Sequence, residues 1–141
     1  AGGNGARAAQ RAEEEIADVL GLTGEPRAAA RVRAREALAA VGLEDSAGAR
    51  AGTLSAGQRA RLTLAIALVC RAALVCLDEP TAHLDETGSA LAGDVLRRLR
   101  ARGAAVLVAT HDPAWTAWTA DAHLRLARGR LEQVAEEAAC P

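Results

Sequence analysis

The sequence contains no lysine, no phenylalanine and no tyrosine, and each absence limits what the chain can do. All 17 basic residues are arginines, so no site can depend on a lysine ammonium group. Two tryptophans are the only aromatic residues, and alanine supplies much of the hydrophobic half of the composition. Such a core buries little apolar area per residue, so we expect a marginally stable domain.

An excess of charge of one sign is also lacking, because 17 basic residues nearly balance 18 acidic ones. The chain therefore has no overall field that would attract nucleic acid or an anionic membrane surface. Arginines do cluster in one segment, at positions 27, 31, 33 and 35. We interpret this cluster as the solvated face of a helix, and we expect no direct contact with nucleic acid.

Long apolar runs are missing as well. The longest apolar stretch, residues 62–77, is interrupted by Arg71 and is too short to span a bilayer, and no signal segment opens the chain. The three cysteines, Cys70, Cys76 and Cys140, show no metal-ligand spacing. We predict buried free thiols in a reducing compartment, and therefore a cytoplasmic location.

Hydrophobic periodicity predicts an α/β fold in which a helical region is followed by a βαβ unit. The predicted helices span residues 6–20, 27–41, 56–69 and 86–100, and a short helix that starts at Asp112 carries Trp115 and Trp118. The predicted strands are 73–77 and 104–109, read as buried on both faces, and 122–127 and 131–135, joined by a turn. A right-handed crossover makes the first two strands parallel. We divide the chain into residues 1–72 and 73–141, two parts of one partial domain.

Polar residues follow each of the two predicted parallel strands. Asp78 and Glu79 come directly after the first strand, and His111 follows the second. Because ligands bind at the carboxyl ends of strands in such sheets, these side chains are candidates for one site. Asp78 suits Mg²⁺, and Glu79 suits a water that attacks a phosphoryl group. The alternative is that the two carboxylates only cap a turn.

Three segments carry a resemblance when they are taken in order. They are "LSAGQ" at 54–58, "ALVCLDEPTAHLD" at 73–85 and "VLVATHD" at 106–112. Together they resemble the C-terminal half of an ATP-binding cassette (ABC) ATPase over roughly residues 40–134, with Ala56 in place of one glycine of the LSGGQ signature. The resemblance implies a partial P-loop NTPase fold: a helical subdomain, then a parallel sheet that lacks the Walker A strand.

The resemblance also implies a role for each matching residue. Ser55, Ala56, Gly57 and Gln58 would form the signature, which receives the γ-phosphate of an ATP held by the opposite subunit. Asp78, in the Walker B strand, would serve Mg²⁺, and Glu79 would be the catalytic base. His111 would sense the γ-phosphate, and Asp85, at the end of the D-loop, would communicate across the dimer. Physically, the start of a helix capped by Ser55 is a ready anion site, and Gly57 permits close approach to a phosphate.

The Walker A cradle G-x-x-x-x-G-K-[ST] is the part that is missing. Only "GGNGARAA", Gly2–Ala9, begins like it, and Arg7, Ala8 and Ala9 stand where the second Gly, the Lys and the Ser/Thr are needed. No strand is predicted before this segment. We therefore predict that the chain alone binds MgATP poorly and does not hydrolyse it, which leaves its status as an enzyme uncertain. Residues 104–109 should lose a neighbouring strand and expose a sheet edge, so that the chain aggregates or depends on a partner.

Three functions fit this combination. The first is an ATP-binding subunit, or a fragment of one, that couples ATP hydrolysis to transport. It would work with a transmembrane permease and with a second ATPase subunit that has an intact Walker A, at the inner face of the cell membrane. The second is a fragment of the ribosome-associated ABC-F class, because "DEPTAHLD" differs at Ala82 from that class's "DEPTNHLD". The third is a non-catalytic subunit that completes a partner's ATP site.

Overall fold

The computed structural model describes residues 9–112 and 120–134. The predicted helix with Trp115 and Trp118, and also Cys140, lie outside these described residues. The chain divides into two compact units, Ala1–Ala109 and Thr110–Pro141. The second unit is small and carries one antiparallel hairpin within its described part, whereas the first holds the described helices and a parallel strand pair.

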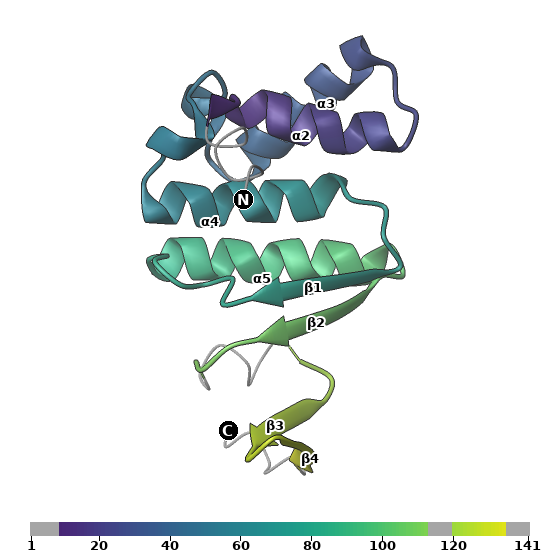
Figure 1. The fold of residues 1–141 in the computed structure, drawn as a ribbon, viewed down its shortest axis with the longest axis vertical. Helices are drawn as coiled ribbons and strands as arrows, with labels where there is room; N and C mark the ends of the chain where they lie inside the picture. The colour runs from purple at the N-terminus through teal and green to yellow at the C-terminus, as the bar shows by residue number, and fades with distance from the viewer. Residues whose placement is uncertain (1–8, 113–119, 135–141) are drawn as a thin grey trace. The chain divides into compact units, whose positions relative to one another are not determined.

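Three helices of the first unit agree with the sequence prediction to within one residue at each end, whereas the helix predicted from residue 6 begins at Ala12. The helices are α2 (Ala12–Leu22), α3 (Arg27–Ala40), α4 (Ala56–Val69) and α5 (Glu86–Ala101). Two short 3-10 helices, η1 (Glu44–Ser46) and η2 (Ala51–Thr53), lie in the loop before α4 and were not predicted. Figure 1 shows α4 and α5 side by side, with α2 and α3 on the other side of α4.

Local chemistry explains where these helices begin. Three glutamates occupy the first turn of α2, where the partial positive charge of a helix N-terminus favours them. The backbone N–H of Arg11 donates to the carboxylate of Glu14 at 3.2 Å. Ser55 and Asp85 cap α4 and α5 with side-chain oxygens.

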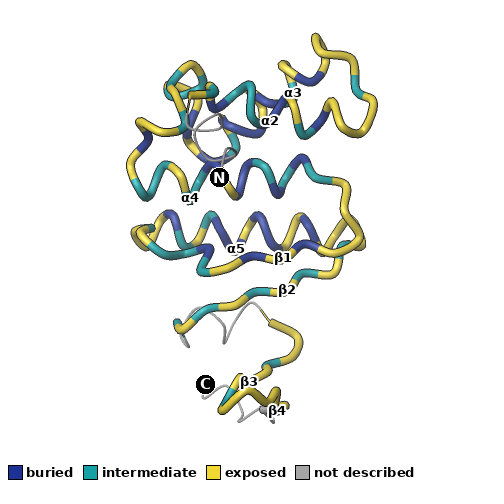
Figure 2. Tube along the Cα trace, viewed as in Figure 1, coloured by how far each residue is buried: buried dark blue, intermediate teal, exposed yellow. Residues whose placement is uncertain are grey.

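The core of the first unit lies between the helices. Its largest fully buried side chains are Ile16, Leu20, Leu38, Val41, Leu64, Val95 and Leu99. The buried face of α3 is formed by Ala30, Ala34, Ala37 and Leu38, so alanine lets this helix pack closely. Hydrophobic periodicity would group Val32 with Leu38 and Val41 on one side of the helix, but Val32 is exposed and does not belong to that face. Figure 2 shows the alternation of buried and exposed residues along each helix.

The βαβ unit is confirmed. Strands β1 (Leu74–Asp78) and β2 (Ala105–Ala109) pair in parallel, in a register that joins Leu74 to Ala105 and Asp78 to Ala109. Within the described residues β2 pairs with β1 alone.

The prediction that both strands are buried on both faces is wrong. Val75 and Leu77 are buried, whereas Leu74, Cys76 and Asp78 between and beside them are exposed. The run of apolar residues is continuous, yet only one face of β1 is covered within the described chain. Cys70 and Cys76 are free thiols. The prediction that they are buried fails most clearly for Cys76, which is exposed, whereas Cys70 is partly buried.

The second unit contains the predicted hairpin. Strands β3 (His123–Ala127) and β4 (Arg130–Val134) are antiparallel. The two residues between them, Arg128 and Gly129, both have positive φ, as the tightest hairpin turns require. None of the helices described in either unit is both long enough and apolar enough to cross a membrane.

Candidate functional site

The signature segment forms the start of α4. Ser55 is the N-cap residue: its side-chain oxygen accepts from the backbone N–H of Gln58 at 3.1 Å, and the side chain of Gln58 accepts from the Ser55 N–H at 2.9 Å. Gln58 also donates from Nε2 to Ser46 Oγ at 3.3 Å. Ser55 is exposed at the positive end of a 14-residue helix, where an anion is favoured.

Gly57 lies against the turn that follows the Asp-Glu pair. A Cβ at position 57 would stand 2.9 Å from the backbone carbonyl oxygen of His83. That distance is shorter than a carbon and a carbonyl oxygen tolerate, so glycine is required for this approach. Ala56, the residue that departs from the signature glycine, is partly buried. The signature therefore packs against this turn at Gly57.

Asp78 and Glu79 stand at the carboxyl end of β1. Asp78 is the last residue of the strand and is exposed, and Glu79 is partly buried. Glu79 has φ of 46°, a left-handed conformation that is uncommon for a residue with a side chain. Its backbone N–H donates to the Ala109 carbonyl at 2.8 Å. This bond ties the residue after β1 to the end of β2.

Residues 79–85, named here the carboxylate turn, connect β1 to α5. Internal bonds run from Ala82 N–H to the Glu79 carbonyl and from Leu84 N–H to the Thr81 carbonyl, both at 3.0 Å. His83 has φ of 65°. The turn ends at Asp85, whose Oδ1 accepts from the Gly88 N–H at 2.8 Å. Arg61 of α4 also reaches this carboxylate, with 3.6 Å between Nη2 and Oδ1.

The structure therefore brings Gly57 of the signature, and Arg61 of the same helix, against the carboxylate turn. His111 follows β2 by two residues, is exposed and belongs to the second unit. The contacts of Arg61 and of the His83 carbonyl were missed by sequence reasoning. Arg61 stands in the "GQRARL" segment, but nothing local in the sequence points to Asp85, which lies 24 positions farther along the chain.

A magnesium ion could be held at Asp78 only with help from other groups. Within residues 9–112 and 120–134, no cluster of three His, Cys, Asp or Glu side chains could enclose a metal ion. Proteins usually hold Mg²⁺ through one or two carboxylates, with phosphate oxygens and water completing the shell. An exposed Asp78 fits that arrangement.

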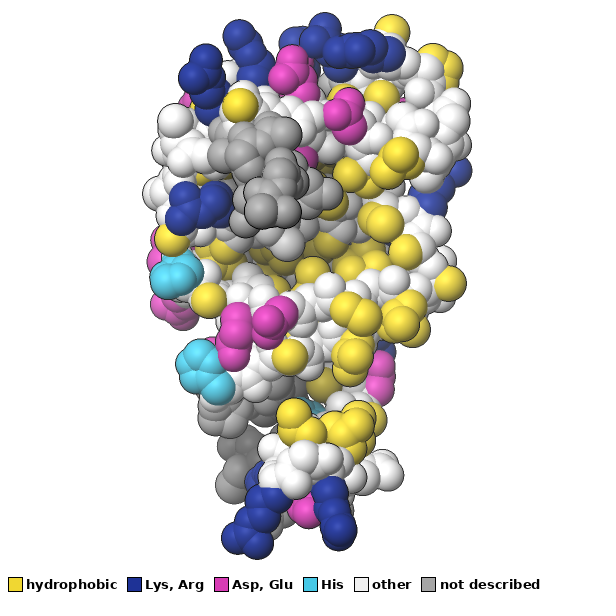
Figure 3. Space-filling model, in the orientation of Figure 1, with side chains coloured by type: hydrophobic (Ala, Val, Ile, Leu, Met, Phe, Trp, Pro, Cys, Tyr) yellow, Lys and Arg dark blue, Asp and Glu magenta, His cyan; other side chains and the backbone are white. Residues whose placement is uncertain are grey.

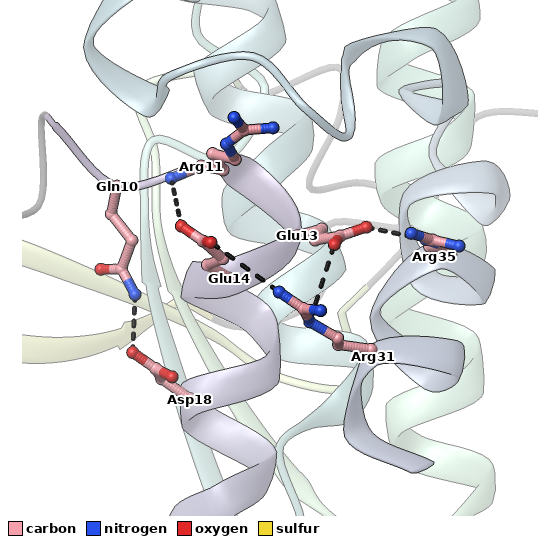
Figure 4. A network of polar contacts seen from close by, with 7 residues as sticks. All are labelled: Gln10, Arg11, Glu13, Glu14, Asp18, Arg31 and Arg35. Carbon is pink, nitrogen blue, oxygen red and sulfur yellow. Dashed lines mark hydrogen bonds and ion pairs between the residues drawn. The ribbon is translucent and has the colours of Figure 1, made fainter. Parts of the chain in front are cut away.

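The arginine cluster of α3 is engaged with acidic side chains (Figure 4). Arg35 Nε donates to Glu13 at 2.7 Å, Arg31 lies 3.9 Å from the same carboxylate, and Arg33 pairs with Glu25. The hydrogen bond from Arg35 lowers the pKa of Glu13; partial burial opposes the shift, and the charges of Arg35 and Arg31 add to it. Figure 3 shows the basic groups gathered over α2 and α3 beside acidic ones. This arrangement supports the reading of the cluster as a solvated, ion-paired face.

Comparison with known proteins gives one family match and a set of relatives. The sequence model of the family described as ABC transporter matches residues 5–82, more than half of the chain. The match includes Ser55, Gly57, Asp78 and Glu79, and it ends before Asp85 and His111.

The relatives are ATP-binding proteins of transport systems. The chain is 41% identical over 121 residues to the lipoprotein-releasing system ATP-binding protein LolD of Chromohalobacter salexigens, which covers 85% of this chain and 51% of that protein. It is 44% identical over 90 residues to the macrolide export ATP-binding/permease protein MacB 1/2 of Paracoccus denitrificans, over 64% of this chain and 14% of that protein. The chain thus spans about half the length of the LolD proteins it matches.

The fold has a counterpart among solved structures. An ABC transporter chain in an inward-facing conformation superimposes with a TM-score of 0.73, covering 89% of this chain and 52% of that chain. Sequence identity over the match is 24%, so this likeness concerns the fold.

Proposed function

Because the chain belongs to the ABC transporter family, we propose that it acts as an ATP-binding subunit of a transporter, or as part of one, and couples ATP hydrolysis to transport. The observation that carries this proposal is the contact between the start of α4 and the carboxylate turn. It joins an exposed helix N-terminus suited to phosphate with a strand end that carries two carboxylates.

The roles of the residues follow from their chemistry. Ser55 and the first amides of α4 bind the γ-phosphate of an ATP that a partner subunit holds. Asp78 holds Mg²⁺, which when bound neutralises charge on the phosphate oxygens. Glu79 orients the attacking water and accepts its proton. His111 hydrogen-bonds the γ-phosphate, and Asp85 communicates with the partner subunit.

The given sequence has no lysine for a Walker A cradle. We therefore propose that the chain alone binds MgATP weakly, and that it meets a second ATPase subunit and a transmembrane permease at the inner face of the cell membrane. Two relatives have names that refer to lipoprotein release and to macrolide export. These names support a transporter over a ribosome-associated ABC-F protein.

The test has two steps. First, the purified chain is incubated with MgATP; we expect no phosphate release above the buffer rate. Hydrolysis that disappears in Glu79→Gln would contradict the need for a partner. Second, lysates of the organism that makes the protein are fractionated by sedimentation. We expect the chain with membranes, whereas recovery with ribosomes would favour ABC-F.

A second candidate function is a non-catalytic subunit that lends the α4 N-terminus to a partner's site. The observation in its favour is again the absence of lysine. In this case, adding the purified chain to membranes from the producing cells should raise their ATPase rate, and Ser55→Arg should abolish the rise because its side chain blocks the helix N-terminus. Equal stimulation by the variant would rule this function out.

A further inference from the structure

We propose that Arg61 is a positioning residue that holds the carboxylate turn against the start of α4. The meaning of this inference rests on the proposed function, since the turn carries Glu79 and Asp85. Its test, however, needs neither ATP nor a partner, so the two proposals can fail separately.

The guanidinium of Arg61 lies between two negative groups. Its Nη1 donates to the Val41 carbonyl at 3.2 Å, and its Nη2 stands 3.6 Å from Asp85 Oδ1. Val41 directly follows α3, at the helix end whose free carbonyls carry partial negative charge. Asp85 caps the positive end of α5. Positive and negative groups therefore alternate from α3 through Arg61 to α5.

The surroundings leave room for a guanidinium at this point. Gly42 has φ of 67°, and a Cβ there would stand 3.1 Å from Arg61 Nη1. Only 24% of the Arg61 side chain is exposed. The planar guanidinium of arginine can contact two negative groups at once through its separate N–H groups, whereas a lysine ammonium acts as a point charge. Both acceptors of Arg61 are therefore matched to arginine.

The turn is fixed at three places. Glu79 N–H bonds to the Ala109 carbonyl at its start, the His83 carbonyl rests against Gly57 in its middle, and Asp85 meets Arg61 at its end. Two of these places belong to α4. A shift of the α4 N-terminus is thereby passed to the turn that carries Glu79, which is what a positioning role requires.

The experiment measures hydrogen exchange of backbone amides by NMR in the full chain. Arg61→Gln removes the charge, Arg61→Lys retains it, and Arg59→Gln is the matched control, because Arg59 lies on the same helix and bonds to the Leu54 carbonyl. Asp85→Asn is the reciprocal variant: it keeps a capping oxygen but loses the charge.

We expect Arg61→Gln to speed exchange at Ala82 and Leu84 on the order of fivefold, as the loss of a partly exposed charge contact predicts, and to leave Gly88 protected because its cap by Asp85 remains. Arg61→Lys keeps the charge but not the two-pronged geometry, so it should restore only part of the protection. Asp85→Asn should release Ala82 and Leu84 but leave Gly88 protected.

Amides in the buried middle of α4, at Leu64 and Ala65, should keep their protection in every variant, and Arg59→Gln should match the wild type. Unchanged exchange in the turn of Arg61→Gln overturns the proposal. A loss of protection spread equally over α4 and the turn overturns it too, since that result describes a general structural role. If Arg61→Gln does not fold, the exchange of Ala82 and Leu84 in Asp85→Asn decides between the same two outcomes.

Discussion

At the scale of single residues, Gly57 decides whether the signature can touch the carboxylate turn. Gly57→Ala places a methyl group 2.9 Å from the His83 carbonyl oxygen, and backbone on both sides leaves no flexible atom to move away. We expect a loss of about 1–3 kcal/mol in the free energy of unfolding, the usual cost of overpacking. Urea unfolding followed by circular dichroism measures it.

The matched control for this prediction is Gly21→Ala in α2. No atom lies within 4 Å of a Cβ built at Gly21, so that change should be neutral or should stabilise by up to about 1 kcal/mol, as expected for alanine in a helix. If both variants unfold at the same urea concentration as the wild type, the close approach of Gly57 to His83 is refuted.

Ser55 allows folding and phosphate binding to be separated. Ser55→Ala removes the cap of Gln58 N–H and should cost about 0.5–2 kcal/mol. Ser55→Asp keeps a capping oxygen, so the free energy of unfolding should stay near that of the wild type, but its negative charge repels a phosphate. Thermal unfolding and the stimulation of membrane ATPase together check this. A Ser55→Asp chain that still stimulates the membranes contradicts the phosphate role.

The candidate site shows what sequence reasoning can reach at this scale. The positions of Ser55 as a helix cap and of Asp78 at a strand end follow from local patterns, and the structure confirms both placements. The approach of Gly57 to His83 and the contact of Arg61 with Asp85 are long-range packing facts. They depend on how α4 lies against the turn, and no local pattern encodes that.

At the scale of elements, α3 presents a narrow buried stripe in a helix rich in arginine. Leu38 is fully buried and Val32 is exposed. Leu38→Ala should therefore lower the free energy of unfolding by about 2–5 kcal/mol through a cavity, while Val32→Ala should change it by less than about 0.5 kcal/mol. Urea titration of both variants measures the contrast. Equal losses would place Val32 in the core.

The contact of α2 with α3 should depend on pH through Glu13. Its pKa is lowered in the folded chain, chiefly by the hydrogen bond from Arg35. A lowered pKa means that the stabilisation is present above the unfolded value, about 4.3 for glutamate, and is lost as the pH falls through the folded value.

The variant that measures this effect is Glu13→Gln. The difference in free energy of unfolding between wild type and Glu13→Gln should be constant near pH 7 and shrink below about pH 4.3. Glu15→Gln serves as a control from the same turn of α2. A difference that stays constant down to pH 2, or that grows on acidification, contradicts the assigned role of Glu13.

The helices could be predicted because periodicity and caps are local: α4 begins after the predicted cap Ser55, and α5 begins at the residue that periodicity indicated. The faces of β1 could not, because a continuous apolar run is compatible with one covered face or two. Whether the second face is covered depends on which other elements pack against the sheet. The sequence of the five residues of β1 does not determine that.

At the scale of the whole molecule, the first unit presents an apolar sheet face. Leu74 and Leu107 are 56% and 53% exposed on neighbouring strands, and Cys76, the register partner of Leu107, is exposed beside them. Figure 3 shows hydrophobic side chains gathered over the region of β1 and α5. Parallel sheets are normally covered on both faces, so such a surface favours association.

We expect the isolated chain to self-associate through this face, and Leu107→Glu to weaken that association by placing a charge on β2, the predicted edge strand. Because Leu107 is half exposed, the free energy of unfolding should change by less than about 1 kcal/mol. Leu77→Glu is the contrasting variant: it buries a carboxylate at a position only 8% exposed and should unfold the chain.

Sedimentation velocity over a range of protein concentrations measures the association. If Leu107→Glu unfolds like Leu77→Glu, the second face of the sheet is covered within the chain itself; if it stays folded and monomeric where the wild type associates, the face is the surface through which this chain meets other proteins.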